Sequence, residues 1–271
     1  MAKKILLASG CSYTDPNYKS CDPDVDPNWK MWPELMANEL NLQCVNKAMS
    51  GKGADHILDS ILEQLAAYGD RVDTVAILWS TSDRLPFFNF TLNPIIEINT
   101  PHHPSGVDPF PWLDDIGVGR VSQKYFNSAH FQRNDVYRAM ILNPIRKIFA
   151  IMEICEKRNI KFVMFSGLVY FDHFAINHMV ENKVLPENCA ISSSEVVKTL
   201  LHNPIFAEID KRKKHFIGWP ILKEMGGYTY DDLRYGKEEY FISKLDKHPS
   251  KAGQETIARC FVERYNDIYS S

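Results

Sequence analysis

Short apolar segments alternate with amphipathic helices along this chain, and this alternation constrains the fold more than any other feature. Residues 4–9, 74–79 and 161–166 are predominantly apolar runs that end at glycine or polar residues. Such runs are typical of strands buried on both faces of a parallel sheet. Residues 54–68 and 251–269 carry apolar side chains at helical spacing. The pattern predicts an α/β fold in which helices cover both faces of one mostly parallel sheet.

Two long stretches interrupt this alternation. Residues of about 84–135 are rich in proline, asparagine and histidine, and residues of about 170–240 are irregular, with one or two helices expected among them. A chain of 271 residues, 45% of them hydrophobic, can bury a sizeable core as one large domain or two small ones. Because no repeat or flexible linker divides the chain, we predict a single domain, residues 1–271, with two insertions.

The charge and cysteine content exclude several classes of partner. The net charge is −3, and the one strong basic run, residues 211–214, is typical of a solvated helix face, so no nucleic-acid partner is expected. The cysteines are scattered without a C-x-x-C pair, which indicates reduced thiols. No apolar run approaches the ~20 residues of a membrane span or forms a signal-peptide core. We therefore expect a soluble, cytoplasmic protein without a membrane partner.

A serine, a histidine and an aspartate each lie at the edge of a predicted element. Ser12 lies in a Gly-x-Ser-x-Thr turn directly after the first strand, and Asp246 and His248 lie just before the last helix. The carboxyl ends of parallel strands share one crevice, where these segments can converge. A serine hydroxyl needs an adjacent base, and a histidine serves best when a carboxylate fixes its tautomer. The three residues predict nucleophilic acyl-transfer chemistry; the alternative is that they only cap helices and turns.

Four short blocks in order along the chain resemble the motif blocks of the SGNH (GDSL-type) hydrolases. They lie at residues 10–14, 32–35 with 46–51, 80–83, and 246–249. The first and last blocks together are a fairly specific signal, whereas the middle two alone would be weak.

This resemblance implies a three-layer α/β/α sandwich of the flavodoxin-like kind and a Ser-His-Asp triad. By the resemblance, Ser12 is the nucleophile, His248 is the base and Asp246 orients the base. The oxyanion hole is implied to consist of the amides of Ser12 and Gly51, with help from the side chain of Ser82. No metal or organic cofactor is implied.

Three positions depart from the family pattern. Cys11 replaces the usual aspartate beside the nucleophile, a residue that is not a triad member. Ser82 stands where the family has an asparagine, and a serine hydroxyl reaches less far; losing one oxyanion donor can cost about 3 kcal/mol. The Asp-x-His spacing of the last block is one residue shorter than the common form, and related O-acetyl-transferring members use this shorter spacing.

Other candidate sites are weaker. Cys11 is predicted to be a small packed residue on the opposite side of the turn from Ser12, not the nucleophile. His102 and His103 lack a partner at metal-ligand spacing. The Asp-x-Asp-x-Asp run at residues 22–26 begins like a calcium loop, but proline occupies the positions that require glycine and glutamate.

The sequence therefore predicts a serine hydrolase that cleaves a carboxylic ester, with an O-acylated carbohydrate-like or small-molecule substrate. One alternative is an O-acyltransferase, in which an alcohol resolves the same acyl-enzyme. Another is a binding or structural protein on this scaffold whose catalytic power has decayed, which the serine at position 82 would favour. The two insertions are predicted to form part of a substrate pocket or a contact between copies of the chain.

Overall fold

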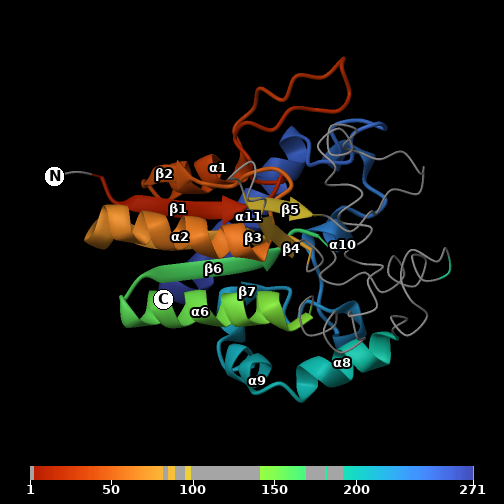
Figure 1. The fold of residues 1–271 in the computed structure, drawn as a ribbon. Coiled ribbons are helices and arrows are strands. Elements are labelled where there is room, and N and C mark those ends of the chain that lie inside the picture. Colours follow the sequence, from red (N-terminus) through yellow and green to blue (C-terminus); the bar gives the residue numbers. More distant parts are fainter. Residues whose placement is uncertain are drawn as a thin grey trace.

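A five-stranded, fully parallel sheet forms the centre of the molecule (Figure 1). The computed structural model describes residues 3–81, 85–88, 95–98, 141–168, 181 and 192–270. The strands lie in the order β2-β1-β3-β6-β7. Their bounds are Gln43–Asn46 for β2, Ile5–Gly10 for β1, Val72–Trp79 for β3, Lys161–Ser166 for β6 and Phe216–Ile217 for β7. The predicted α/β class is confirmed, and this sheet is wholly rather than mostly parallel.

This strand order fixes where a site can form. When the strands of the sheet are numbered along the chain, their order is 2-1-3-4-5. The next two strands after β1 therefore lie on opposite sides of it. In doubly wound sheets of this order, a crevice opens at the carboxyl ends of the first and third strands. Ser12 follows β1 directly, and residues 80–81 follow β3. The fold thus places the predicted nucleophile at the crevice.

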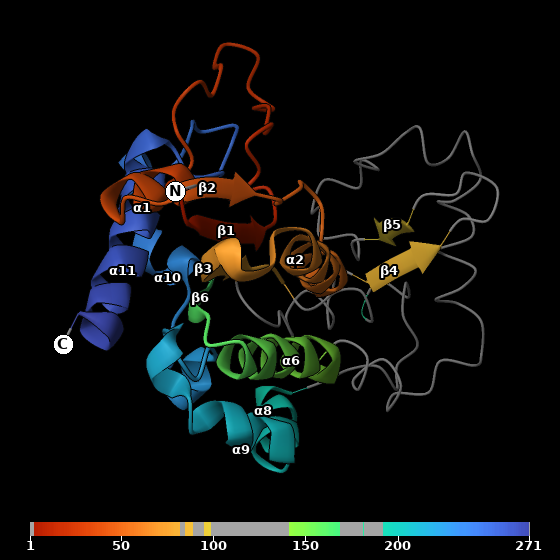
Figure 2. The ribbon, with the colours of Figure 1, turned by 90° about the vertical axis from the view of Figure 1, so that its left-hand side faces the viewer.

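Helices cover both faces of the sheet (Figure 2). Helices α2 (Ala54–Tyr68) and α6 (Asn143–Lys157) pack on one face, and α1 (Trp32–Glu39) and α11 (Lys251–Tyr269) pack on the other. Helix α9 (Pro204–Asp210) contacts α6 and α8 (Ser193–Leu201). The short α10 (Tyr230–Arg234) precedes the segment that leads to α11. This is the three-layer arrangement that the sequence predicted.

The remaining elements are short. Strands β4 (Leu85–Phe88) and β5 (Ile95–Ile98) form a separate antiparallel pair. Turns of 3₁₀ helix occur at Gly69–Arg71, Lys213–His215, Lys223–Met225 and Glu238–Tyr240. The other residues of the first predicted insertion, and residues 170–180 and 182–191 of the second, lie outside the described part of the chain. The prediction of a single domain with two insertions stays a prediction.

Two apolar clusters bury the sheet. The helices α2 and α6 contribute isoleucines that pack against β1, β3 and β6 on one face. On the other face, the Trp32 indole of α1 stacks on the Phe261 ring of α11 at a centroid distance of 4.2 Å. Burial of such side chains stabilises the fold by about 25 cal/mol per Å² of apolar surface. Both helical layers are therefore packed firmly against the sheet whose strand ends carry the site.

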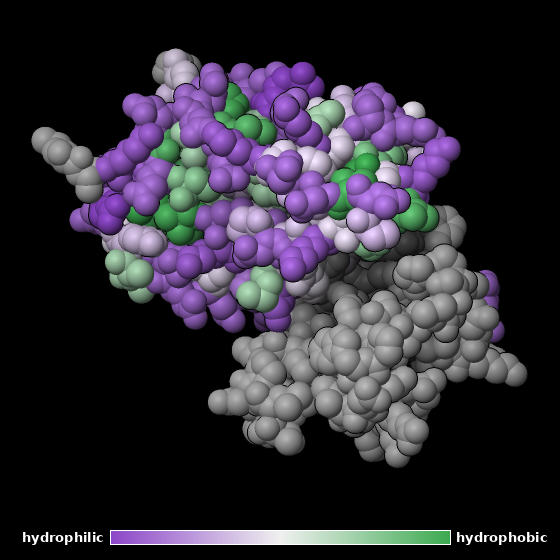
Figure 3. All heavy atoms as spheres, turned by 90° about the horizontal axis from the view of Figure 1, so that it is seen from above, coloured by the Kyte–Doolittle hydropathy of each residue, from purple (hydrophilic) through white to green (hydrophobic). Residues whose placement is uncertain are grey.

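The outer surface is polar by comparison. Seen from above, its described part is mainly hydrophilic, and hydrophobic side chains appear in small separate patches (Figure 3). Among the helices in the described part of the chain, none has the length and apolar character needed to cross a membrane.

Candidate active site

A tight turn at the end of β1 presents Ser12. The amides of Thr14 and Asp15 both donate to the Cys11 carbonyl, at 2.9 and 3.0 Å. The turn is possible because Gly10 has no side chain: a Cβ there would lie 2.4 Å from Thr14 Oγ1 and 2.9 Å from the backbone oxygen of Leu78. Glycine at the strand end therefore allows the nucleophile turn to fold against β3.

The structure brings Ser12, His248 and Asp246 together. Ser12 Oγ lies 2.9 Å from Nε2 of His248, although the two residues are 236 positions apart in sequence. Nδ1 of His248 lies 2.7 Å from Oδ1 of Asp246. Both separations are within hydrogen-bond reach, as a nucleophile, a base and an orienting acid require.

Backbone and side-chain hydrogen bonds hold the segment that contains Asp246 and His248 in place. Ser243 Oγ accepts from the amide of Asp246 at 3.0 Å, and the amide of Ile242 donates to the His248 carbonyl at 2.9 Å. Ser250 then caps α11, with its Oγ accepting from the amide of Gly253 at 3.2 Å. Capping by Ser250 thus coexists with the triad contacts, because different residues make them.

Asp246 is buried and accepts hydrogen bonds on both oxygens. Oδ1 accepts from the backbone and the ring of His248, at 3.0 and 2.7 Å. Oδ2 accepts from the Tyr18 hydroxyl at 2.8 Å, the Ser20 hydroxyl at 2.7 Å and the Cys21 amide at 3.2 Å. Burial alone raises the pKa of Asp246, but the donors, led by the His248 amide, outweigh it and hold the pKa at about 2.

This lowered pKa predicts a defined loss of stability in acid. Because the folded pKa of Asp246 is below the ordinary 3.8, its ionised form stabilises the native state above that value. The contribution, about 2 kcal/mol, should be lost as the pH falls from about 4 through about 2. Urea unfolding at pH 5, 4, 3 and 2 measures it as the difference between the wild type and Asp246→Asn. A difference that stays constant over this range would contradict the assignment.

Three of the residues that hold Asp246 come from a loop that sequence reasoning passed over. Residues 15–30 are rich in aspartate, proline and asparagine, a composition that predicts only a loop. Tyr18, Ser20 and Cys21 of that loop all contact Oδ2 of Asp246. No local pattern in the sequence signals contacts between residues more than 220 positions apart.

The predicted oxyanion loop is tied to the nucleophile turn. Oδ2 of the buried Asp15 accepts from both the amide and the hydroxyl of Ser50, at 2.7 and 2.6 Å. Nδ2 of Asn46 donates to the Thr14 carbonyl at 2.6 Å. Gly51, next along this loop, has a φ of +79°, which only glycine adopts without strain. Asp15 was not singled out from the sequence, although it holds this loop against the turn.

The residues that follow β3 include buried hydroxyl groups without a hydrogen-bond partner among the described residues. Ser82, the third predicted oxyanion donor, lies outside the described residues. Immediately before it, the hydroxyls of Ser80 and Thr81 are buried and have no hydrogen-bond partner within the described part of the chain. Buried hydroxyls in native proteins are normally paired, so these two are available to a ligand or to residues not described.

Arg234 connects the nucleophile turn to the segment that carries the base. Its guanidinium donates to the hydroxyl of Tyr13 and to the carbonyl of Lys247, the neighbour of His248. It also pairs with Asp231 at 2.6 Å, and its side chain is only 8% exposed. No sequence pattern indicates this role, because α10 lies within the predicted second insertion.

Replacing Arg234 by methionine should destabilise the protein strongly. The change keeps much of the volume but leaves Asp231 without its cation and the Lys247 carbonyl without its donor. Removing one partner of a buried pair costs about 3–5 kcal/mol. The measurement is urea unfolding, with Arg71→Met as a control, because Arg71 is exposed and should change stability by less than about 0.5 kcal/mol. Equal losses in the two variants would argue against the connecting role.

The remaining features singled out in the sequence are Cys11, the two adjacent histidines and the basic run at residues 211–214. Cys11 is fully buried in the core, as predicted. Within the described residues there is no group of histidine, cysteine or acidic side chains that could hold a metal ion. His102 and His103 lie outside those residues. In the basic run, Arg212 pairs with Glu153 and Glu156 of α6.

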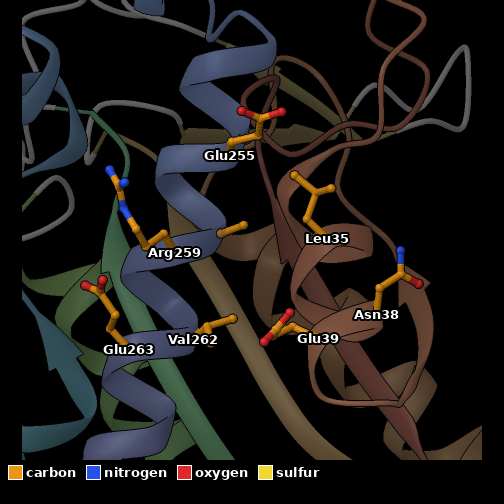
Figure 4. Close-up of a pocket in the computed structure, with 8 residues that line it drawn as sticks. Leu35, Asn38, Glu39, Glu255, Arg259, Val262 and Glu263 are labelled. Carbon is orange, nitrogen blue, oxygen red and sulfur yellow. The ribbon is translucent and has the colours of Figure 1, made fainter.

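A groove of about 550 Å³ lies between α1 and α11 (Figure 4). None of the predicted site residues lines it. The residues around it are Leu35, Asn38 and Glu39 of α1 and Glu255, Ala258, Arg259, Val262 and Glu263 of α11. It is therefore separate from the triad.

The chain is similar in structure, at low sequence identity, to solved structures of hydrolases. No family model matches the sequence, and no curated protein matches it. A lipase/acylhydrolase from Enterococcus faecalis is 12% identical, with a TM-score of 0.45, over 98% of this chain and 97% of its own. An esterase from Pseudoalteromonas sp. is 11% identical, with a TM-score of 0.45, over 99% and 100%. A GDSL-like lipase from Bacteroides thetaiotaomicron is 12% identical, with a TM-score of 0.44, over 99% and 93%.

The structural neighbours of this chain are SGNH (GDSL-type) hydrolases. This is the family whose motif blocks the sequence resembles. At identities this low, the likeness does not assign an activity to the chain.

Proposed function

We propose that this chain is a serine hydrolase that cleaves a carboxylic ester, with Ser12, His248 and Asp246 as its triad. The observation that carries the proposal is the continuous line of short contacts from Ser12 Oγ through the imidazole to the Asp246 carboxylate, at 2.9 and 2.7 Å. A buried carboxylate with a lowered pKa stays ionised at neutral pH, as the orienting acid of a triad must.

The geometry supports a two-step mechanism. Ser12 Oγ attacks the ester carbonyl while Nε2 of His248 takes its proton, so the new C–O bond forms a tetrahedral intermediate. Its collapse breaks the bond to the alcohol, which leaves with the proton from Nε2. Water then attacks the acyl-enzyme by the same route and releases the acid. Asp246 holds Nδ1–H and stabilises the imidazolium in both steps.

The oxyanion is proposed to bind the amides of Ser12 and Gly51 and the hydroxyl of Ser82. Support comes from the Asp15–Ser50 contacts, which fix the glycine-bearing loop beside the nucleophile turn. Preorganised donors of this kind contribute about 3–4 kcal/mol each to transition-state stabilisation. No metal or organic cofactor takes part in this chemistry.

The proposed substrate is an O-acylated carbohydrate-like or small molecule, and the proposed location is the cytoplasm. Each cysteine in the described part of the chain is a free thiol, as a reducing compartment favours. The chemistry of the triad is the same for an acyltransferase, in which an acceptor alcohol replaces water. The intact line of contacts argues against a scaffold that has lost its catalytic groups.

A fluorophosphonate probe and a series of short aryl esters test the proposal. We expect one adduct per chain, mapped by mass spectrometry to the peptide that contains Ser12, together with release of the aryl alcohol. Absence of both labelling and turnover would exclude the enzyme. Adding an acceptor alcohol and measuring the partition of the acyl group between alcohol and water then distinguishes transfer from hydrolysis.

A further inference from the structure

Tyr18 touches both the acid and the base of the proposed triad. Its hydroxyl lies 2.8 Å from Oδ2 of Asp246 and 2.6 Å from Nδ1 of His248. Its ring is tilted by 32° over the imidazole, with the centroids 4.2 Å apart. Tyr18 therefore contacts the side chains of both Asp246 and His248.

The direction of these hydrogen bonds follows from the chemistry of the groups. A phenol has one hydrogen to donate and two lone pairs. Burial and the nearby carboxylate raise the pKa of Tyr18, so the hydroxyl keeps its hydrogen. An ionised carboxylate can only accept, so the hydrogen points to Asp246. A lone pair of the same oxygen then faces Nδ1, which must carry its own hydrogen to make the 2.6 Å contact favourable.

This arrangement acts on the far side of the imidazole. When Nδ1 carries the hydrogen, Nε2 of neutral His248 has its lone pair free for the Ser12 hydroxyl, 2.9 Å away. In the opposite tautomer the hydrogen is on Nε2, so the N–H points at Ser12 and Nε2 could not take the proton. The stacked Tyr18 ring and the edge-on Tyr13 ring, 5.4 Å away, also restrict rotation of the imidazole.

We propose that Tyr18 is a positioning residue of the triad, whose hydroxyl bridges Asp246 to Nδ1 of His248 and, together with the Asp246 carboxylate, favours the tautomer that can activate Ser12. The inference rests on the proposed function, because it assigns Tyr18 a part in the same acyl transfer. The loop of residues 15–30 is then part of the catalytic apparatus and not only a connection.

Tyr18→Phe is the matched test, since it keeps the ring and removes only the bridging oxygen. A hydrogen bond to a charged group contributes about 1.5–3 kcal/mol, so kcat should fall about 10- to 100-fold. KM should change less than about twofold, because the bridge matters in the transition state and not in ester binding. Ser20→Ala is the comparison within the loop: Ser20 donates to the same carboxylate oxygen at 2.7 Å but does not contact the imidazole, so its loss in kcat should be smaller than that of Tyr18→Phe and should leave the His248 tautomer unchanged.

A second readout needs no substrate. Two-bond ¹H–¹⁵N spectra of histidine-labelled protein at pH 8, with the His248 signals assigned through His248→Asn, report which ring nitrogen carries the hydrogen. We expect hydrogen on Nδ1 in the wild type and in Ser20→Ala, and a mixture of tautomers in Tyr18→Phe. Thermal unfolding of each variant shows that the fold is kept.

The outcomes separate the two proposals. No labelling or turnover by the wild type would overturn the proposed function, while the tautomer spectra would still test Tyr18. Unchanged kcat and an unchanged tautomer in Tyr18→Phe would overturn the positioning role. So would equal losses in Tyr18→Phe and Ser20→Ala, because these would indicate that both residues only hold the carboxylate in place.

Discussion

Replacing Ser12 with alanine is expected to abolish fluorophosphonate labelling and to lower kcat for ester hydrolysis by about 10⁴- to 10⁶-fold. The variant keeps the turn, since the amides of Thr14 and Asp15 still reach the Cys11 carbonyl. It removes only the oxygen that would attack the ester and accept the acyl group. The measurements are the adduct mass and the turnover of a short aryl ester, with thermal unfolding to verify the fold.

Cys11→Ala is the control for this prediction. Cys11 is the neighbouring nucleophilic atom in sequence, but it is fully buried in the core. Its loss should reduce stability through a small cavity and leave the Ser12 adduct in place. Loss of labelling in Cys11→Ala, with labelling retained in Ser12→Ala, would make the thiol the nucleophile and exclude the assignment made above.

Asp246→Asn has the next largest expected effect, a loss in kcat of about 10⁴-fold. Every hydrogen-bonding group around the carboxylate is placed to donate to it, as the lowered pKa of Asp246 also indicates. An amide brings two hydrogens of its own. If the NH₂ group faces His248, Nδ1 must become an acceptor, and the hydrogen moves to Nε2, where it faces Ser12. The base then has the wrong tautomer.

The other orientation of the amide is also unfavourable. The NH₂ group would then face the Tyr18 and Ser20 hydroxyls, which can rotate, and the Cys21 amide, which cannot. We expect a loss of stability of about 1–3 kcal/mol, measured by urea unfolding at pH 7. Asp22→Asn is the control, because its carboxylate accepts from the Asp24 amide of its own loop and, among the described residues, has no hydrogen bond to Ser12, His248 or Asp246. A variant at Asp246 that retains wild-type kcat would exclude it as the orienting acid.

Sequence reasoning succeeded where the signal was local. The strand at Lys161–Ser166, the helix at Ala54–Tyr68 and the helix at Lys251–Tyr269 have the predicted bounds, because apolar patterning and flanking polar residues define them within one window. The convergence of Ser12, His248 and Asp246 was predictable for a related reason: each lies at the edge of such an element, and parallel strands bring these edges together.

The parts that were missed depend on contacts between distant segments. The strand β7 has only two residues, too few to show a pattern, and pairs with β6 from within the predicted second insertion. Tyr18 and Arg234 look like ordinary loop and helix residues in sequence. Their contacts exist only because the folded chain places Tyr18 and Arg234 against residues 228 and 221 positions away, Asp246 and Tyr13. Burial and hydrogen bonding across such separations carry no local signature.

The positions of Ser12 and His248 along the chain have a consequence for folding during synthesis. The proposed nucleophile, Ser12, lies in the turn that follows β1, and the proposed base, His248, follows 236 residues later. At a synthesis rate of about 5–20 residues per second, Ser12 leaves the ribosome about 10–50 s before the segment with His248 and α11 can join it. Until then the growing chain holds a serine without a base, and so no active nucleophile. The proposed activity would therefore arise only when the segment with His248 has folded against the Ser12 turn, which makes it a direct report on that step of folding.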